Sequence, residues 1–305
     1  MSLVINTNVA SLNAQRSLAT SGGELKTAME RLSSGKQINS AADDAAGFAI
    51  AERMTAQIRG LNMATKNAND GLSMIATVEN ATNDVTDMLH RIRELAVQAA
   101  NDTNSATDRG YLQKEVDSLL DEINRVASQT VYNGKEVLDG SRSATQIQVG
   151  TDKGQSISFA IAAVDTDTLN LSFDSFAARS GATPAAVANM TGETADTTGT
   201  LITGEKISVL TAASAGHTLA AVTAAIETVA GNRAELGAVS NRLEYTVSNL
   251  MNVAEFTTAA RSRIEDADFA AESARLSKAQ VLQQTGTAML AQANASQQLA
   301  LSLFR

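Results

Sequence analysis

Two adjacent carboxylates, Asp43 and Asp44, are the residues whose types and spacing best suit acid/base chemistry. Such a pair needs a nearby His, Lys or nucleophile to exchange protons with. No such partner accompanies the pair, and His90 and His217 lie far apart in the sequence. Ser40 to Asp43 instead fits a capping box, with the Ser oxygen accepting from a free helix N–H and the Asp reaching back. Asp44 would add a charge that the helix dipole favours, so we predict structural roles and no catalytic site.

A short polar motif, Ser34-Gly35-Lys36, has the ending of a phosphate-binding loop. That loop needs a Gly five residues before Gly35 and a Ser or Thr after the Lys. Glu30 and Gln37 occupy those positions, so we reject a nucleotide site.

A second oxygen-rich stretch, Asp165, Asp167 and Asn170, resembles the start of a calcium loop. Leu169 stands where a further oxygen ligand is needed, and no Gly or distal Glu follows. Residues 261–268 mix basic and acidic side chains and are predicted to form a charged joint between helices. The chain also lacks Cys, so we expect no metal, no cofactor and no enzymatic activity.

The elements that carry these side chains are predicted to be long helices. Apolar residues recur at heptad spacing in 45–101, in 107–129 and most regularly in 219–264. A single Pro, Pro184, leaves both flanks free of helix breakers. We also expect helix over 1–33, loosened at Gly22-Gly23. The predicted fold is mainly α, with long antiparallel coiled-coil helices from both termini.

The middle of the chain changes to a period of two, which is typical of strands. Residues 146–149 and 156–159 alternate around a turn at 152–154 and are predicted to form a β-hairpin. Asn133-Gly134 is a further turn signal. Residues 177–216 are rich in Ala, Thr, Gly and Ser and predict a short surface-exposed segment, with one strand-like piece at 206–210.

The far end of the chain carries an apolar seam that nothing downstream can cover. It predicts a coiled-coil face, and its best partner within the chain is the N-terminal helix. Small residues on the seam bury little area, so two such helices stabilise each other weakly. We expect copies of the chain to complete the pair. The predicted polymerisation residues are Ile5, Val9, Leu12, Leu18, Leu25, Leu32, Leu282, Met289, Ala293 and Leu303.

Composition narrows the classes of partner. The net charge is −9, of which residues 1–40 carry +2 and residues 266–305 carry none, so the acidic excess lies in the middle. An acidic chain without a basic stripe argues against nucleic acid. No stretch approaches 18 apolar residues, and the first residues lack a basic and then apolar leader. We therefore expect neither membrane insertion nor a cleavable signal peptide.

Several stretches at the two ends together resemble bacterial flagellin. The N-terminal matches are Ile5 to Asn8, Arg31 to Gly35, Ser40 to Gly47, Arg91 to Gln98 and Tyr132 to Gly134. The C-terminal matches are Leu236 to Val239, Ala260 to Asp266 and Leu290 to Asn294. Residues 177–216 are not covered by this resemblance.

The resemblance implies a structural subunit that polymerises into the extracellular flagellar filament used for motility. It implies unfolded export by the flagellar type III route with an export chaperone, and assembly among flagellar cap and hook-junction proteins. Residues 1–43 and 266–305 would form the inner tube, ordered only after assembly. Residues 44–176 and 217–265 would form a surrounding helical shell, with 177–216 outside it.

The same resemblance implies that Arg91, Leu95 and Glu115 contact the Toll-like innate immune receptor that senses flagellins. Packing between subunits is an alternative role for these residues, and the two roles are compatible. Two other functions stay open on the residues alone. A surface adhesin or ligand-binding protein would need a site in 177–216, whereas a hook–filament junction protein would share the helical ends without elongating.

Overall fold

The computed structural model describes residues 8–142, 144–171 and 207–302, with side chains described as far as residue 296. Its contacts divide the chain into two compact units. One, here called the terminal unit, comprises Met1–Gly60 and Asn252–Arg305. The other, here called the helical unit, comprises Leu61–Met251.

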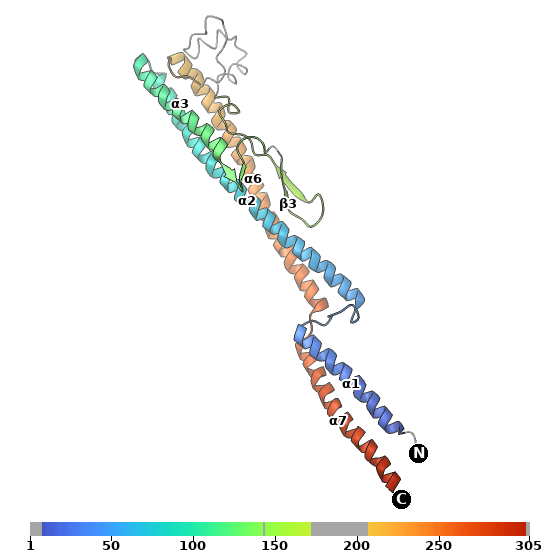
Figure 1. The fold of residues 1–305 in the computed structure, drawn as a ribbon. Helices are drawn as coiled ribbons and strands as arrows, with labels where there is room; N and C mark the ends of the chain where they lie inside the picture. Colours follow the sequence, from blue (N-terminus) through green and yellow to red (C-terminus); the bar gives the residue numbers. More distant parts are fainter. Residues whose placement is uncertain (1–7, 143, 172–206, 303–305) are drawn as a thin grey trace. The chain divides into compact units, whose positions relative to one another are not determined.

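The described elements are long helices with two small hairpins (Figure 1). The helices are α1 (Val9–Ser34), α2 (Ala45–Ala99), α3 (Ala106–Gln129), α6 (Ala212–Glu265) and α7 (Phe269–Ser302). The strands are β1 (Val131–Tyr132), β2 (Lys135–Glu136), β3 (Thr145–Gln148) and β4 (Ser156–Phe159). The predicted mainly α fold is confirmed.

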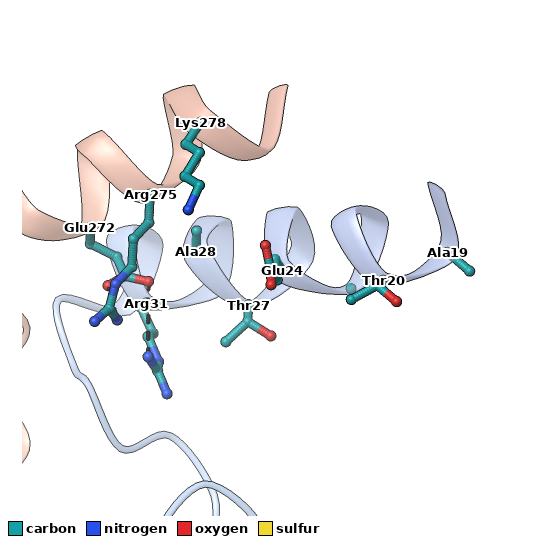
Figure 2. Close-up of a pocket in the computed structure, with 10 residues that line it drawn as sticks. Ala19, Thr20, Glu24, Thr27, Ala28, Arg31, Glu272, Arg275 and Lys278 are labelled. Atoms are coloured by element: carbon teal, nitrogen blue, oxygen red, sulfur yellow. Dashed lines mark hydrogen bonds and ion pairs between the residues drawn. The ribbon is translucent and has the colours of Figure 1, made fainter. Parts of the chain in front are cut away.

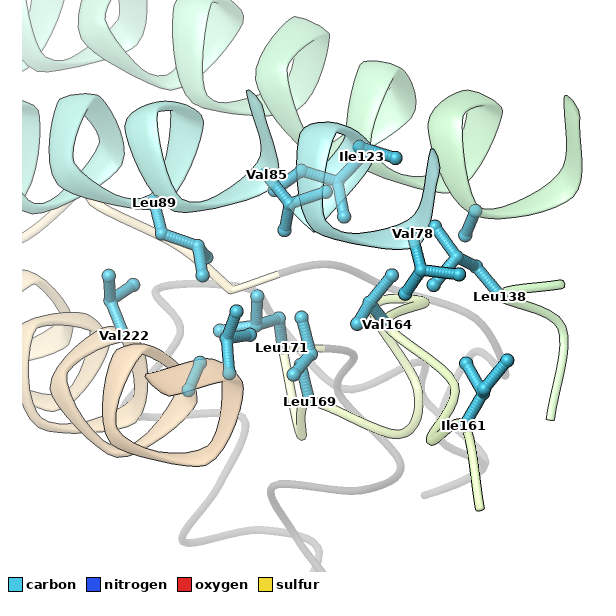
Figure 3. Close-up of a cluster of buried hydrophobic side chains, with 14 of the residues drawn as sticks. Val78, Val85, Leu89, Ile123, Leu138, Ile161, Val164, Leu169, Leu171 and Val222 are labelled. Atoms are coloured by element: carbon cyan, nitrogen blue, oxygen red, sulfur yellow. The ribbon is translucent and has the colours of Figure 1, made fainter. Parts of the chain in front are cut away.

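The helical unit has one continuous apolar core, to which α2, α3 and α6 each present a heptad face (Figure 3). On α6 the buried positions recur every seven residues, which confirms the predicted periodicity. They are Val222, Val229, Leu236, Leu243 and Leu250. Side chains from the loop after β4, including Ile161, Val164 and Leu171, close the core against α2 and α6. Fully buried Leu and Ile side chains each contribute roughly 1.5–3 kcal/mol of hydrophobic stabilisation.

Both predicted hairpin signals are confirmed. β1 and β2 pair around Asn133 and Gly134, which both have positive φ, as the turn requires. β3 pairs antiparallel with β4, with Ile147 opposite Ile157 and both side chains buried. The second hairpin packs on α2 because Gly71 has no side chain there: a Cβ at Gly71 would lie 2.1 Å from Ile147 Cδ1.

Helix starts differ from the sequence prediction at one site. α3 begins with a complete capping box between Ser105 and Asp108. At Ser40 the predicted box is only half formed: Asp43 accepts from the Ser40 N–H, but α2 begins five residues later at Ala45. Asp44 is the actual cap, since its Oδ1 accepts from the N–H groups of the second and third helical residues at 3.0 Å. Ser40 and Asp44 both have side chains that can cap a helix, so the sequence alone did not show which of them caps α2.

Two further predictions need correction. α1 runs without interruption through Gly22-Gly23, because packing against α7 outweighs the low helix propensity of Gly. Residues 207–209 are not surface exposed, because Ile207 and Val209 are buried in the core of the helical unit, and 207–210 forms no strand; Ala213 and Gly216 are exposed as predicted. The Ile207 N–H donates to the Leu171 carbonyl, which ties this stretch to the loop after β4. The rest of the predicted outer segment, 177–206, lies outside the described residues.

In the terminal unit, α1 and α7 lie side by side and antiparallel (Figure 1). Their connecting segments meet in a single antiparallel bridge between Lys36 and Asp266. The Gln37 N–H donates to the Glu265 carbonyl at 2.6 Å, and the Ala267 N–H donates to the Gly35 carbonyl at 2.9 Å. The charged joint predicted at 261–268 is therefore confirmed as the place where α6 ends and α7 begins.

Candidate functional site

The paired carboxylates serve as structural acceptors. Hydrogen bonds from the Ser40 backbone and side chain lower the pKa of Asp43, so it stays charged at neutral pH. Asp108 resembles it, with a pKa lowered by the Ser105 side chain. A general acid at neutral pH needs a raised carboxyl pKa, so these shifts run in the opposite direction.

The two His residues and the acidic side chains do not gather into a metal site within the parts of the chain that the structure describes. His90 and His217 are both exposed and lie on different helices, α2 and α6. Among the described residues no group of three or more His, Cys, Asp or Glu could hold a metal ion. The Asp165 carboxylate, part of the rejected calcium motif, accepts from the Thr168 N–H at 2.9 Å.

The contact between α1 and α7, which we call the seam, is the most distinctive surface of the terminal unit. It consists of buried and half-buried residues spaced three and four apart on both helices. On α1 they are Ser11, Ala14, Leu18, Ser21, Leu25, Ala28 and Leu32. On α7 they are Glu272, Leu276, Ala279, Gln283, Gly286, Leu290 and Ala293.

Small side chains let the two helices approach closely. A Cβ at Gly286 would lie 2.9 Å from Leu18 Cδ1, so this Leu occupies the space that Gly leaves free. Near the far end of the seam, the Asn8 side-chain amide donates to the Ala293 carbonyl at 3.0 Å. The seam therefore has close contacts along its length but buries few large apolar groups.

Seven large apolar residues among the described side chains of α1 and α7, the terminal pair, are exposed and are here called the outer apolar residues. They are Val9, Leu12, Met29, Phe269, Val281, Leu282 and Met289. Leu282 and Met289, 42% and 64% exposed, line a groove of about 590 Å³ between the helices. The α1 side of this groove presents small and polar residues, such as Ala14, Ser17 and Glu24, so no large apolar side chain of α1 covers the two there.

The predicted polymerisation residues thus fall into two sets. Leu18, Leu25, Leu32 and Ala293 lie on the seam, and Val9, Leu12, Leu282 and Met289 lie outside it. Leu282 and Met289 lie at the edge of the seam and line the groove beside it, because Gln283 and Leu290 take the seam positions. For Ile5 and Leu303 the prediction falls outside the described residues.

Sequence reasoning did not select Glu272, Leu276 or Leu290, nor the exposed Val281. A seam search restricted to apolar and small residues passes over a Glu and a Gln. A search for heptad positions that also accepted polar residues would have identified the observed seam.

The three residues implied as receptor contacts occupy different depths of the helical unit. Arg91 Nη2 lies 2.8 Å from Glu115 Oε1, and both side chains are about half exposed. The Glu115 side chain raises the pKa of Arg91 by hydrogen bonding. Leu95 departs from the expectation, because its side chain is 1% exposed and belongs to the core. Leu95 packs in the core beneath the surface that carries Arg91 and Glu115.

No helix within the described parts of the chain is sufficiently long and apolar to span a lipid bilayer.

Comparison with known families matches both ends of the chain. Residues 5–143 match the model of the bacterial flagellin N-terminal helical region, and residues 219–304 match that of the C-terminal helical region. Flagellin A of Vibrio anguillarum is 36% identical over an alignment of 379 positions, covering all of both chains. Flagellin B of Vibrio cholerae is 35% identical over 374 residues, covering 99% of this chain and 100% of the relative.

Solved structures with a similar fold come from flagellar proteins. A putative flagellar hook-associated protein from Vibrio parahaemolyticus aligns with a TM-score of 0.56 over 73% of this chain and 100% of its own, at 13% identity. Bacillus cereus flagellin aligns with a TM-score of 0.44 over 61% of this chain and 88% of its own, at 27% identity.

Proposed function

Because the chain belongs to the bacterial flagellin family and is a structural subunit of the flagellar filament, we propose that it polymerises through its terminal pair. The outer apolar residues would pack against neighbouring copies, and the seam would hold each subunit's two ends together. The observation that carries this proposal is the exposure of Leu282 and Met289 beside a groove whose α1 side presents small and polar residues. Burying such side chains between copies gives roughly 25 cal/mol per Å² of apolar surface.

The proposal assigns layers to the chain. Residues 1–43 and 266–305 would line the filament interior, where crowded chains tolerate little net charge. Residues 44–176 and 217–265 would surround them, together with 207–216, whose Ile207 and Val209 are buried in the helical core, and 177–206 would lie outermost. The antiparallel bridge between Lys36 and Asp266 lies close to both proposed boundaries, which supports a change of layer there.

Two truncations test the role of the terminal pair. Removing residues 1–30 or 280–305 should leave a soluble monomer that does not elongate on filament seeds, as followed by negative-stain microscopy. Long filaments from either truncated chain would contradict the proposal.

Point substitutions give a sharper test with a matched control. Met289→Glu places a charge in the proposed interface and should abolish elongation, with the far-ultraviolet circular dichroism of the free chain unchanged. Gln284→Glu adds the same charge at an exposed position of the same helix, facing away from α1, and should still elongate. Equal elongation by both variants would show that exposed apolar groups on α7 do not drive assembly.

We further propose export as an unfolded chain through the flagellar type III route, with an export chaperone, and assembly among cap and hook-junction proteins. The absence of Cys from the sequence is compatible with unfolding for transport, because no disulfide has to be broken. Expression in a strain with an inactivated flagellar export gate should retain the chain inside the cell.

Recognition by a Toll-like receptor is a second proposal, carried by the half-exposed Arg91–Glu115 pair. An acceptor on the receptor could replace Glu115 as the partner of the guanidinium. Arg91→Ala should weaken receptor signalling by the free subunit, and Arg125→Ala, which removes a similarly exposed ion-paired Arg on α3, should not. Leu95→Ala should act mainly by destabilising the helical unit, because Leu95 is buried.

A further inference from the structure

A buried charge lies within the otherwise small and apolar seam. Glu272 is 5% exposed and is the one charged residue classed as buried among the residues that the structure describes. Its Oε2 accepts from Arg275 Nη1 at 3.1 Å, and its Oε1 lies 3.9 Å from Arg31 Nη1 on α1. Figure 2 shows the three side chains together at one end of a second groove between the helices, separate from the one lined by Leu282 and Met289.

Burying these charged groups costs desolvation free energy. Taking charges out of water costs several kcal/mol per ion, and an apolar replacement of similar volume is often equally stable. Moreover, Arg31 Nε is buried without a hydrogen-bond partner among the described residues. Stability alone therefore does not account for a charge cluster in this seam.

Apart from the contact between Leu18 and Gly286, the rest of the seam defines its register only weakly. On α7 the small residues Ala279, Gly286 and Ala293 stand seven apart, and on α1 so do Ala14, Ser21 and Ala28. Sliding one helix by a heptad places small residues opposite the same Leu side chains again. A seam with such a repeat gains almost the same burial in several registers, and buried polar residues are an established means of selecting one.

We propose that Glu272 and Arg31 are positioning residues that select the register of α1 against α7. In the observed register Glu272 meets the Arg31 guanidinium. A slip of seven residues in one direction places Glu272 opposite Glu24, which adds like-charge repulsion. A slip in the other direction carries Glu272 past Ser34, where α1 ends, so the carboxylate loses its partner.

The bridge between the connecting segments is the competing explanation. Backbone hydrogen bonds at Gly35 and Gln37, with the Lys36–Glu265 ion pair, also oppose sliding at that end. The experiment must therefore remove the buried charges and leave the bridge intact.

The register matters for assembly, and this step rests on the proposed function. A slip of seven residues moves one helix by about 10 Å along the other. Leu282 and Met289 would then stand in a different relation to Val9 and Leu12, so a neighbouring copy would meet a different surface. A mispaired subunit should enter filaments poorly.

Disulfide trapping tests the register directly, because the chain has no Cys of its own. A Cβ at Gly286 would lie 4.0 Å from Leu18 Cβ, within the separation that a disulfide spans. Leu18→Cys combined with Gly286→Cys reports the observed register. Leu18→Cys combined with Ala279→Cys or with Ala293→Cys reports a slip of seven residues in either direction.

Each reporter chain is mixed as a minor fraction into unmodified chain and oxidised during growth on seeds. Disulfides are counted both in the filament and in the unassembled chain, because a mispaired subunit should stay unassembled. Intrachain disulfides are counted by gel mobility and mass spectrometry. With native charges, the Gly286 reporter should be trapped about tenfold or more over either shifted reporter, a ratio equivalent to about 1.4 kcal/mol. Arg31→Leu with Glu272→Leu should abolish this preference.

Two further variants guard against loss of folding. Glu272→Gln keeps the side-chain shape and should reduce the preference without excluding the chain from filaments. Glu272→Arg should transfer trapping to the Ala279 reporter, because that slip brings the new guanidinium opposite Glu24. As a control, Glu122→Gln with Arg125→Gln removes an exposed ion pair of the helical unit and should change nothing.

An unchanged preference for the Gly286 reporter in all three Glu272 variants would overturn the proposal and assign the register to the bridge. Failure of the Met289→Glu assembly test would instead contradict the proposed polymerisation surface. The two failures are distinguishable because trapping measures pairing within one chain, whereas elongation measures contact between chains.

Discussion

The terminal unit and the helical unit are built from similar long helices, yet they bury very different side chains. Ile75, Leu89, Ile92, Leu120 and Leu243 are among the fully buried residues of the helical unit. The buried apolar residues described in the terminal unit are Ala28, Ile38, Ala51 and Ala279. The helical unit buries most of its large apolar side chains within the chain, whereas the terminal unit buries almost none and leaves residues such as Val9, Leu282 and Met289 exposed.

The difference shows how one heptad pattern can serve two purposes. In the helical unit, three helices and a returning loop surround each heptad position with Leu, Ile and Val. In the terminal unit, α1 and α7 meet through half-buried Leu side chains that alternate with Ala, Ser and Gly, which bring the backbones close but bury little area. Heptad spacing predicts that helices pair, whereas side-chain size decides whether the pair is self-sufficient.

The largest effect is expected in the core of the helical unit. Leu89→Ala should lower the free energy of unfolding by about 2–5 kcal/mol, because Leu89 is fully buried and truncation leaves a cavity. Urea unfolding followed by circular dichroism measures the change. A loss below about 1 kcal/mol would mean that this core adjusts easily, and the contrast between the units would weaken.

A smaller loss is expected where the hairpin packs on α2. Gly71→Val introduces a Cβ only 2.1 Å from the present position of Ile147 Cδ1. Overpacking of this kind costs about 1–3 kcal/mol. Shortening the opposing side chain with Ile147→Val in the same chain should recover part of the loss, and the double-mutant cycle measures this coupling. If the losses of the two single variants simply added in the double variant, the strain would not arise from the contact between residues 71 and 147.

Loss of a helix cap should have a moderate and pH-dependent effect. Ser105→Ala removes the cap of α3 and should cost about 1 kcal/mol at neutral pH. Ser40→Ala should cost less, because Asp44 and not Ser40 caps α2.

The pH dependence follows from Asp108, whose pKa the Ser105 side chain lowers below its ordinary 3.8. A lowered folded-state pKa contributes stability above the unfolded pKa, and that stability is lost as pH falls through the folded value. The difference between the parent and Ser105→Ala should therefore be constant above about pH 5 and shrink below about pH 4. If the difference in unfolding free energy between the two chains stayed the same at all pH values, the cap would not depend on the charge of Asp108.

The smallest effect on the free subunit is expected from Leu282→Ala. Leu282 is 42% exposed, so the free energy of unfolding should change by no more than about 0.5 kcal/mol. The critical concentration for elongation should nevertheless rise, because the lost area would be buried between copies. Gln284→Ala is the matched control. An unchanged critical concentration for Leu282→Ala would remove this residue from the interface.

Much of this protein could be predicted from its sequence because helix periodicity is a local property. The heptads of 219–264 define both the helix and the face that it buries, since Val222, Val229, Leu236 and Leu243 recur every seven residues on one side. The turn at Asn133-Gly134 and the register of the strand pair at Ile147 and Ile157 follow from equally local signals. Resemblance at the two ends then indicated the family.

Only the tertiary structure decided which face of α7 meets α1. Ala, Gly and Ser surround that helix on several sides, so the sequence offers two seams of similar quality. The choice depends on the antiparallel partner at the other end of the chain, where Leu18 fills the gap above Gly286 and Arg31 meets Glu272. Local spacing determines which residues share a face, but the energy of burying that face depends on its distant partner.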